Sequence, residues 1–298
     1  MEVLVAGSSG FVGRSLCPKL EAAGHAVRAM TRRPRSYRGA GAPVRGDVHD
    51  VESLEAALAG CEVAYYLVHS LDEPTFEQRD AAAARRFGQA AAEAGVSRIV
   101  YLGGLGADGD HLSTHLRSRR AVEHLLGVAG VPVTTLRAGV IVGHGGISWE
   151  MTRQLVEHLP AMITPRWVRT RTQPIALDDV IRYLVGVLDC PATDGRAFEI
   201  GGPEMLTYGD MLHRLAAIEG RPLLVLPVPL LSPRMSSLWL SLVTDVDPRT
   251  SRSLIESMVN ETVVRDDSIR NLIPFEPMDY DEAILRALGQ RAKARRAA

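Results

Sequence analysis

The sequence predicts an α/β fold in which helices cover both faces of a doubly wound parallel β-sheet. Over the first 140 residues, short runs of β-branched and apolar residues alternate with longer Ala- and Arg-rich stretches, as in β-α-β units. Each of the first four helical stretches ends near a glycine, at position 24, 60, 95 or 130. Glycine readily adopts the positive φ that follows a helix, so these positions are predicted helix ends. In such a sheet the ligand crevice lies beyond the carboxyl ends of the strands.

The apolar runs are the predicted strands, and the stretches between them are the predicted helices. We expect strands at 2–6, 25–30, 43–45, 62–68, 98–102 and 133–137. We expect helices at 11–23, 51–59, 76–94 and 114–129. Right-handed crossovers bring these strands into one parallel sheet.

The pattern loosens after residue 143, where prolines bound most segments. Residues 1–202 are predicted to form the sheet domain, with its core at 1–145 and later segments that complete the sheet. Residues 203–298 are predicted to form mainly a smaller C-terminal lobe and a tail. Further helices are expected at 177–188 and 208–219.

Composition excludes several classes of protein. With 298 residues, 46% of them hydrophobic, the chain can bury a full core, and a net charge of -1 excludes a nucleic-acid partner bound through clustered cations. Cys17, Cys61 and Cys190 are far apart and indicate free thiols in a reducing compartment, with no metal site. Because the N-terminus carries no export signal, we expect a cytoplasmic protein.

The longest apolar stretch is at 223–243, but prolines at 227, 229 and 233 interrupt it. A membrane-spanning helix needs about 20 uninterrupted apolar residues, so no transmembrane span is expected. An amphipathic segment that closes a pocket explains the same composition, and peripheral association with a membrane stays open.

The first predicted strand runs into a glycine-rich loop that opens a helix, Gly7-Ser8-Ser9-Gly10-Phe11-Val12-Gly13. Gly7 allows the tight turn, Gly10 lets the backbone approach a pyrophosphate, and Gly13 lets the helix pack closely on the strand. The helix N-terminus adds N–H groups and a positive dipole. Because strand, loop, helix and second strand arrive in order, the loop predicts dinucleotide binding rather than a plain turn. Its spacing resembles that of the extended and atypical short-chain dehydrogenase/reductases, which implies a Rossmann-type fold.

The end of the second strand distinguishes the two nicotinamide cofactors. An acid there binds the adenosine ribose, whereas cations accommodate a 2'-phosphate. Thr31, Arg32 and Arg33 occupy this position and residues 30–35 contain no acid, so NADP(H) is favoured over NAD(H). A solvated turn is the alternative role for the arginines.

The superfamily resemblance implies cofactor contacts beyond the third and fourth strands. Asp47, followed by Val48, resembles the adenine-contacting aspartate of the family; an Asx turn that caps the next helix is the alternative. Leu67, Val68 and His69 lie where the family places backbone against the ribose and phosphates. A purely structural role for His69 is the alternative.

The resemblance also identifies a departure at the catalytic positions. Gly103, at the end of the fifth strand, stands where related enzymes usually carry a Ser or Thr. The family's Tyr-x-x-x-Lys pair is absent, because the only lysines are Lys19 and Lys293. His115 and Arg119 occupy the two positions. Arg119 is expected to bind ribose as a fixed cation and His115 to move a proton near neutral pH, with a surface histidine as the alternative.

Four segments resemble the NmrA-like atypical subgroup of NAD(P)H-binding proteins: 65–70, 115–119, 136–143 and 164–175. The chain is also similar to the accessory subunit of respiratory complex I that keeps this fold. Since that group includes sensors and structural cofactor binders, two functions follow as expectations. One is an NADPH-dependent reductase of a small carbonyl or activated double-bond substrate. The other is a non-catalytic module that binds the nucleotide and a regulatory partner. The oligomeric state stays open.

The segment 166–171 carries alternating arginines that an extended chain would present on one face. That face would suit an anionic substrate, with Trp167 stacking on the opposite side. Pairing with carboxylates is the alternative, the candidates being Asp178, Asp179 and Asp266.

Overall fold

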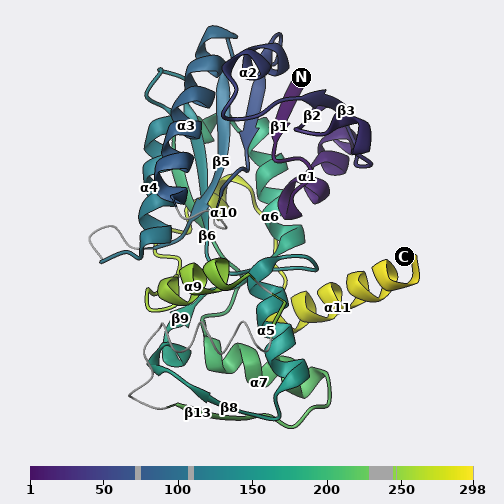
Figure 1. Cartoon of the computed structure of the whole chain (residues 1–298), viewed down its shortest axis with the longest axis vertical. Coiled ribbons are helices and arrows are strands. Elements are labelled where there is room, and N and C mark those ends of the chain that lie inside the picture. Colours follow the sequence, from purple (N-terminus) through teal and green to yellow (C-terminus); the bar gives the residue numbers. More distant parts are fainter. Residues whose placement is uncertain (71–74, 107–110, 228–243, 246, 298) are drawn as a thin grey trace.

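A computed structural model describes residues 1–70, 75–106, 111–227, 244–245 and 247–297. Its centre is a seven-stranded, fully parallel sheet with the order β11-β6-β5-β4-β1-β2-β3 (Figure 1). The strands are β1 (Glu2–Ala6), β2 (Ala26–Thr31), β3 (Ala42–Arg45), β4 (Val63–Tyr66), β5 (Arg98–Gly104), β6 (Val133–Ala138) and β11 (Ala197–Ile200). The predicted α/β class is therefore confirmed. The strand order reverses between β1 and β4, and such a reversal opens a crevice at the carboxyl ends of the two strands.

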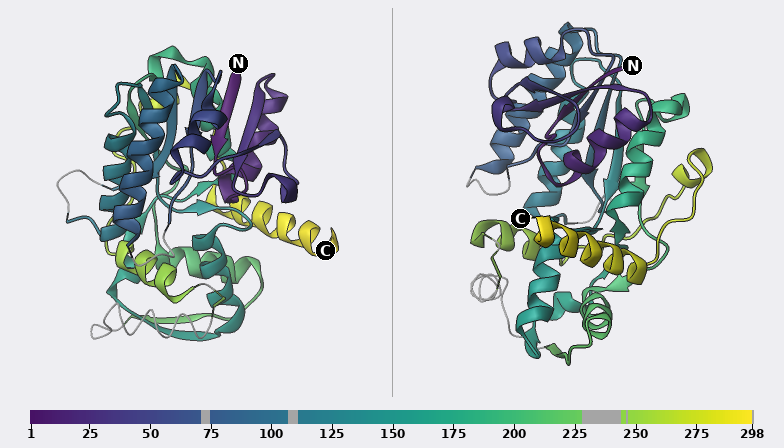
Figure 2. Two further views of the ribbon diagram at one scale, coloured as in Figure 1. Left: turned by 45° about the horizontal axis from the view of Figure 1, so that its top comes forward. Right: turned by 90° about the vertical axis from the view of Figure 1, so that its right-hand side faces the viewer.

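The sheet is the middle of three layers, because alternate residues of each strand face opposite sides. On one face, Val3 and Val5 pack with α1 (Phe11–Ala22) and α6 (Leu177–Gly186). On the other, Leu4 packs with α2 (Val51–Leu58), α3 (Phe76–Glu93) and α4 (Thr114–Leu126). Figure 2 shows these layers from two further directions.

The predicted helix ends near Gly24, Gly60 and Gly95 are confirmed, whereas the one near Gly130 is wrong. The glycines at 24, 60, 95 and 130 have φ of 85°, 75°, 74° and 92°. Helix α4 stops three residues before its predicted end at 129, because Gly127 already terminates its hydrogen bonding. The completion of the sheet by a later segment is also seen, since β11 pairs with β6 through Phe198 and Leu136.

A second body of structure lies below the carboxyl ends of the strands (Figure 1). Its helices are α5 (Ile147–His158), α7 (Tyr208–Ile218), α9 (Pro248–Ser257) and α11 (Tyr280–Ala297). Short strands pair beside them: β7 (Ile141–Val142) with β10 (Ile175–Ala176), β9 (Arg171–Thr172) with β12 (Leu206–Thr207), and β8 (Ala161–Thr164) with β13 (Leu224–Pro227). Helix α10 (Ile269–Leu272) instead packs on the sheet side, where Ile269 is buried with residues of α1 and α6. The described residues also form four 3-10 turns: η1 (Pro34–Ser36), η2 (Arg166–Arg169), η3 (Val187–Asp189) and η4 (Pro191–Thr193). This lobe has its own apolar core, in which Trp149, Trp167 and Ile284 are buried.

The prediction of an extended cationic face at 166–171 is wrong. Residues 166–169 form η2 and turn the indole of Trp167 inward, so that it is 9% exposed. A 3-10 turn has three residues per turn, so the two-residue alternation expected of an extended chain does not apply to this segment. The alternative, pairing with a carboxylate, is seen for Arg171, but the partner is Glu261, whose Oε1 lies 2.8 Å from the Arg171 Nε, and not one of the three candidate aspartates.

Among the described residues, no helix is both long and apolar enough to cross a membrane. Of the apolar stretch at 223–243, residues 224–227 form strand β13, and residues 228–243 lie outside the described part of the chain.

Candidate functional site

A cleft of about 670 Å³ lies at the carboxyl ends of the strands, between the sheet and helices α5 and α9. Its volume is within the usual range for a small-molecule or cofactor site, roughly 300–1,000 Å³. Fifteen sequence-predicted residues line it: Gly7, Ser9, Gly10, Phe11, Val12, Gly13, Arg32, Asp47, Val48, Leu67, Val68, His69, Gly103, His115 and Arg119. Ser8, Thr31 and Arg33 do not line it.

The glycine loop forms a cradle with no space for a side chain. Gly7 has a φ of +92°, and a Cβ there would lie 2.9 Å from the Leu67 carbonyl oxygen. A Cβ on Gly13 would overlap the Gly7 oxygen and lie 2.7 Å from Cα of Ser8. Helix α1 begins at this loop with no side-chain cap on Gly10, which leaves its first N–H groups for an anion. These features fit the pyrophosphate of a dinucleotide.

Ser8 holds the cradle from behind. Its side chain is fully buried, and its hydroxyl donates to the Met30 carbonyl oxygen at 2.9 Å. This bond ties the loop to β2, so Ser8 shapes the cleft without lining it.

The ends of β2 and β3 form one end of the cleft. Arg32 lines it, whereas Thr31 Oγ1 accepts a hydrogen bond from the Arg33 N–H at 3.2 Å. Asp47 Oδ1 accepts from the backbone N–H of His49 at 2.9 Å, which is the predicted Asx turn, and Asp47 nevertheless lines the cleft. No carboxylate of the described residues forms an ion pair with Arg32.

The opposite part of the cleft lies between β4, β5 and α4. His69, Gly103, His115 and Arg119 line it. The Arg119 guanidinium donates to the Leu102 carbonyl oxygen and lies 5.0 Å from the centroid of the Tyr101 ring. These contacts hold a fixed positive charge at the wall of the cleft, with no hydroxyl at Gly103.

His115 lies in the first turn of α4, whose N-cap is Ser113. Burial is the main cause that lowers its pKa to about 3, and the positive charges of Arg119 and His69 lower it further. The imidazole is therefore neutral at pH 7. It can donate or accept a hydrogen bond, but it does not titrate near neutral pH as the sequence had led us to expect.

The sequence patterns did not indicate the lining residues that come from the lobe and from the segment after β4. These are Ser70, Arg79, Ile141, Gly145, Gly146, Ile147, Ser148 and Leu254. The glycines at 143, 145 and 146 were a local signal for a turn close to a ligand. Leu254 carries no local signal, because it reaches the cleft only when α9 packs on α4.

That packing includes a hydrogen-bonded clamp at the start of α4. Asn260 Oδ1 accepts from the Ser113 N–H at 2.9 Å, and its amide nitrogen donates to the His111 carbonyl oxygen at 3.1 Å. The hydroxyls of Ser113 and Ser257 are 2.9 Å apart. The clamp joins the lobe to the helix that carries His115.

The doubly wound sheet and its glycine cradle define a nicotinamide-dinucleotide-binding protein. Residues 7–165, more than half of the chain, match the NAD(P)H-binding family, and the chain belongs to that family. The superfamily resemblance in the sequence is thereby confirmed.

Relatives include a reductase and a subunit of an NADH dehydrogenase. The chain is 30% identical over 233 residues to the (4-alkanoyl-5-oxo-2,5-dihydrofuran-3-yl)methyl phosphate reductase of Streptomyces griseus, covering 74% of this chain and 75% of that protein. It is 24% identical over 224 residues to NADH dehydrogenase [ubiquinone] 1 alpha subcomplex subunit 9 of Dictyostelium discoideum, covering 71% of this chain and 62% of that protein. Mycobacterial relatives are 28% identical over 232 residues, and the matched region is 25% of their length.

Solved structures share the fold. The triphenylmethane reductase of Citrobacter sp., complexed with NADP(H), superposes with a TM-score of 0.77 at 17% sequence identity. The similarity covers 96% of this chain and 100% of that chain.

Proposed function

We propose that this protein is an NADPH-dependent reductase that transfers a hydride to a carbonyl or polarised double bond of a small organic molecule. The observation that carries the proposal is a single cleft that joins the glycine cradle, Arg32, His115 and Arg119. A relative that is a reductase supports it. When bound, the cofactor supplies the hydride.

The preference for NADP(H) rests on Arg32. It lines the cleft, no acid stands at the end of β2, and no described carboxylate neutralises it. A guanidinium binds a phosphate through two parallel N–H groups, which suits the 2'-phosphate of NADPH.

In the proposed reaction Arg119 binds the cofactor and His115 orients the substrate. Arg119 is held by Leu102 and Tyr101, so it offers a fixed cation to ribose hydroxyls without reorganising. The neutral imidazole of His115 orients the substrate oxygen by donating a hydrogen bond, and it does not begin the reaction protonated. The proton that completes the reduction therefore comes from water through the open cleft.

A second candidate is a non-catalytic sensor or structural subunit that binds NAD(P)H. It is favoured by the missing Tyr-x-x-x-Lys pair and by Gly103 in place of a hydroxyl. The similarity to a subunit of NADH dehydrogenase supports it.

Three further assignments belong to the proposal. The subgroup is NmrA-like. The nucleotide is held mainly by the sheet domain, and the lobe that contains α5, α7, α9 and α11 lies on the substrate side. The protein works in the cytoplasm, which its three free cysteines support.

The first test is a fluorescence titration with NADPH and with NADH, after a check for nucleotide carried through purification. We expect Arg32→Ala to weaken NADPH by about 1–3 kcal/mol and to leave NADH unchanged, because one charge-assisted hydrogen-bonding group is lost. Arg35→Ala is the matched control, since Arg35 lies in the same segment, is exposed and does not line the cleft. Equal losses for the two cofactors would contradict the assignment.

The second test separates the two candidates. A screen of carbonyl substrates with NADPH is expected to reveal turnover that His115→Ala reduces strongly while NADPH affinity stays the same. An unaltered rate would remove His115 from the mechanism. Bound nucleotide that does not exchange, together with no turnover, would favour the sensor or structural subunit.

A further inference from the structure

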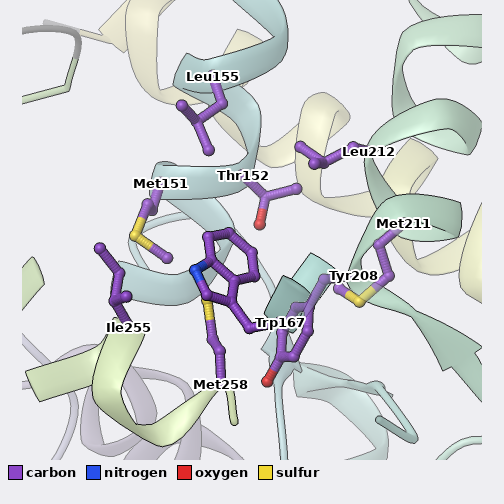
Figure 3. A pocket seen from close by; sticks show the side chains of 9 residues that line it. All are labelled: Met151, Thr152, Leu155, Trp167, Tyr208, Met211, Leu212, Ile255 and Met258. Atoms are coloured by element: carbon purple, nitrogen blue, oxygen red, sulfur yellow. The ribbon is translucent and has the colours of Figure 1, made fainter. Parts of the chain in front are cut away.

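A second cavity, the lobe chamber, lies inside the C-terminal lobe between α5, η2, α7 and α9 (Figure 3). Its volume is about 20 Å³, which is room for roughly one water- or methyl-sized group. Its lining is almost wholly apolar. The side chains used below are Met151, Thr152, Trp167, Met211, Leu212 and Met258.

The lobe chamber lies directly behind the wall of the cofactor cleft. On α5, Ser148 lines the cleft and Thr152, one turn later, lines the chamber. The Thr152 hydroxyl donates to the Ser148 carbonyl oxygen at 2.8 Å, and one helical turn spans about 5.4 Å. On α9, Leu254 lines the cleft and its neighbour Ile255 lines the chamber. A substrate in the cleft is therefore about one helical turn from the chamber.

The chamber contains a buried donor without an acceptor. Trp167 is 9% exposed, and its indole N–H has no hydrogen-bond partner among the described residues. The other two polar groups are satisfied, Thr152 by Ser148 and the Tyr208 hydroxyl by threonine side chains. In Figure 3 the Trp167 indole lies among the side chains that line the cavity. An unpaired buried N–H is costly, so this geometry indicates an acceptor brought by a ligand.

The lining can also widen. Met151, Met211 and Met258 are unbranched and flexible, and such side chains adapt to ligands of different shape. Trp167 is fixed by contrast, because it packs edge-on against Tyr208 with ring centroids 5.9 Å apart and an angle of 87°. The chamber thus combines a rigid donor with a deformable apolar wall.

We propose that the lobe chamber binds the outer end of the substrate's apolar arm, a terminal methyl group of an alkyl chain whose neighbouring oxygen accepts a hydrogen bond from the Trp167 N–H. This rests on the proposed reductase function and specifies its substrate class. The cleft binds the reacting carbonyl, and the chamber selects the chain attached to it.

The test uses protein loaded with NADP+, which has no hydride to transfer, and with carbon-13 labels on the methionine methyl groups, so that binding is read without turnover. The probes are methyl ethyl ketone, methyl hexyl ketone, and an ether in which oxygen replaces the next-to-last carbon of the hexyl chain. We expect only the two long probes to shift the methyl signals of Met151, Met211 and Met258. The ether should bind about 3- to 10-fold tighter than methyl hexyl ketone, since it satisfies the donor.

Three variants identify the chamber. Trp167→Phe keeps most of the ring but removes the N–H, so the preference for the ether should disappear. Leu212→Phe should weaken both long probes, whereas Leu212→Ala, which enlarges the chamber, should strengthen them. Leu285→Ala is the control, because Leu285 is 59% exposed and does not line the chamber.

The outcomes distinguish this proposal from the proposed function. NADPH affinity is measured separately, and its absence would overturn the reductase itself. Normal NADPH binding with unmoved methyl signals would overturn only the chamber assignment and leave a packing void. Equal binding of all three probes would likewise overturn the chamber assignment alone.

Discussion

Gly13→Ala tests whether the glycine cradle is the cofactor site. Gly13 is buried in the first turn of α1, and a Cβ there would lie 2.7 Å from Cα of Ser8. Ordinary contact begins at 3.4 Å, so Cα of Ser8 would have to retreat by about 0.7 Å, the difference between these two distances, and the Gly7 oxygen, which the Cβ would overlap, would have to move further. Ser8 cannot retreat freely, because it is buried and bonded to Met30.

The expected change in the free energy of unfolding of Gly13→Ala is the sum of two contributions of opposite sign. Forcing a methyl group against packed backbone costs about 3 kcal/mol at the upper end of the usual range. Replacing glycine by alanine in a helix returns about 1 kcal/mol. The net destabilisation is therefore about 2 kcal/mol, and distortion of the cradle should weaken NADPH at least about tenfold.

The assay pairs urea unfolding with an NADPH titration. Gly289→Ala is the matched control, since nothing lies within 4 Å of its added Cβ in helix α11. That variant should gain about 0.5–1 kcal/mol of stability and keep its NADPH affinity. If Gly13→Ala keeps both the stability and the NADPH affinity of the parent protein, the cradle is not the binding site.

Three further outcomes are expected. The pKa of His115 in the folded chain is about 3, below the ordinary 6.5, so the stability that the neutral imidazole contributes is complete above pH 6.5 and is lost as the pH falls. Between pH 7 and 5 the free energy of unfolding should therefore fall by about 1–2 kcal/mol less in His115→Gln than in the parent protein, and an unchanged pH dependence would contradict the burial of His115. Asn260→Ala removes two hydrogen bonds at the start of α4 and should cost about 2 kcal/mol in urea unfolding, with Asn260→Asp milder because it keeps the acceptor; equal stabilities would show that the clamp contributes nothing. Arg153 is 5% exposed and bridges Glu150 and Glu157, whose pKa values it lowers. Arg153→Met should lower the free energy of unfolding by about 3–5 kcal/mol above pH 4.5, and this loss should shrink as the pH falls below that value. A loss that does not depend on pH would exclude the ion pairs as its cause.

Local features of the sequence were enough for the sheet and the cradle. The turn at Gly7 and the helix end at Gly24 each need a positive φ at one residue. Glycine adopts a positive φ without steric cost, so its position in the sequence predicts both features. Alternation of apolar residues likewise follows from strand geometry alone. Arg32 directly follows the last residue of β2, so its place at the end of the strand could also be predicted from the local sequence.

Other parts of the site depend on contacts between distant residues. Asn260 donates a hydrogen bond to the His111 carbonyl oxygen, 149 positions away in the sequence, and no local sequence pattern predicts that contact. The sequence suggested that Trp167 could stack on the face opposite the arginines of an extended segment. In the structure the segment turns and the indole is buried in the lobe core instead. The neutral state of His115 also depends on burial and on neighbouring charges, since the residue type sets only the starting pKa. The backbone geometry of neighbouring residues thus determined the cofactor cradle. Packing between distant segments determined which lobe residues line the cleft, the protonation state of His115 and the lobe chamber.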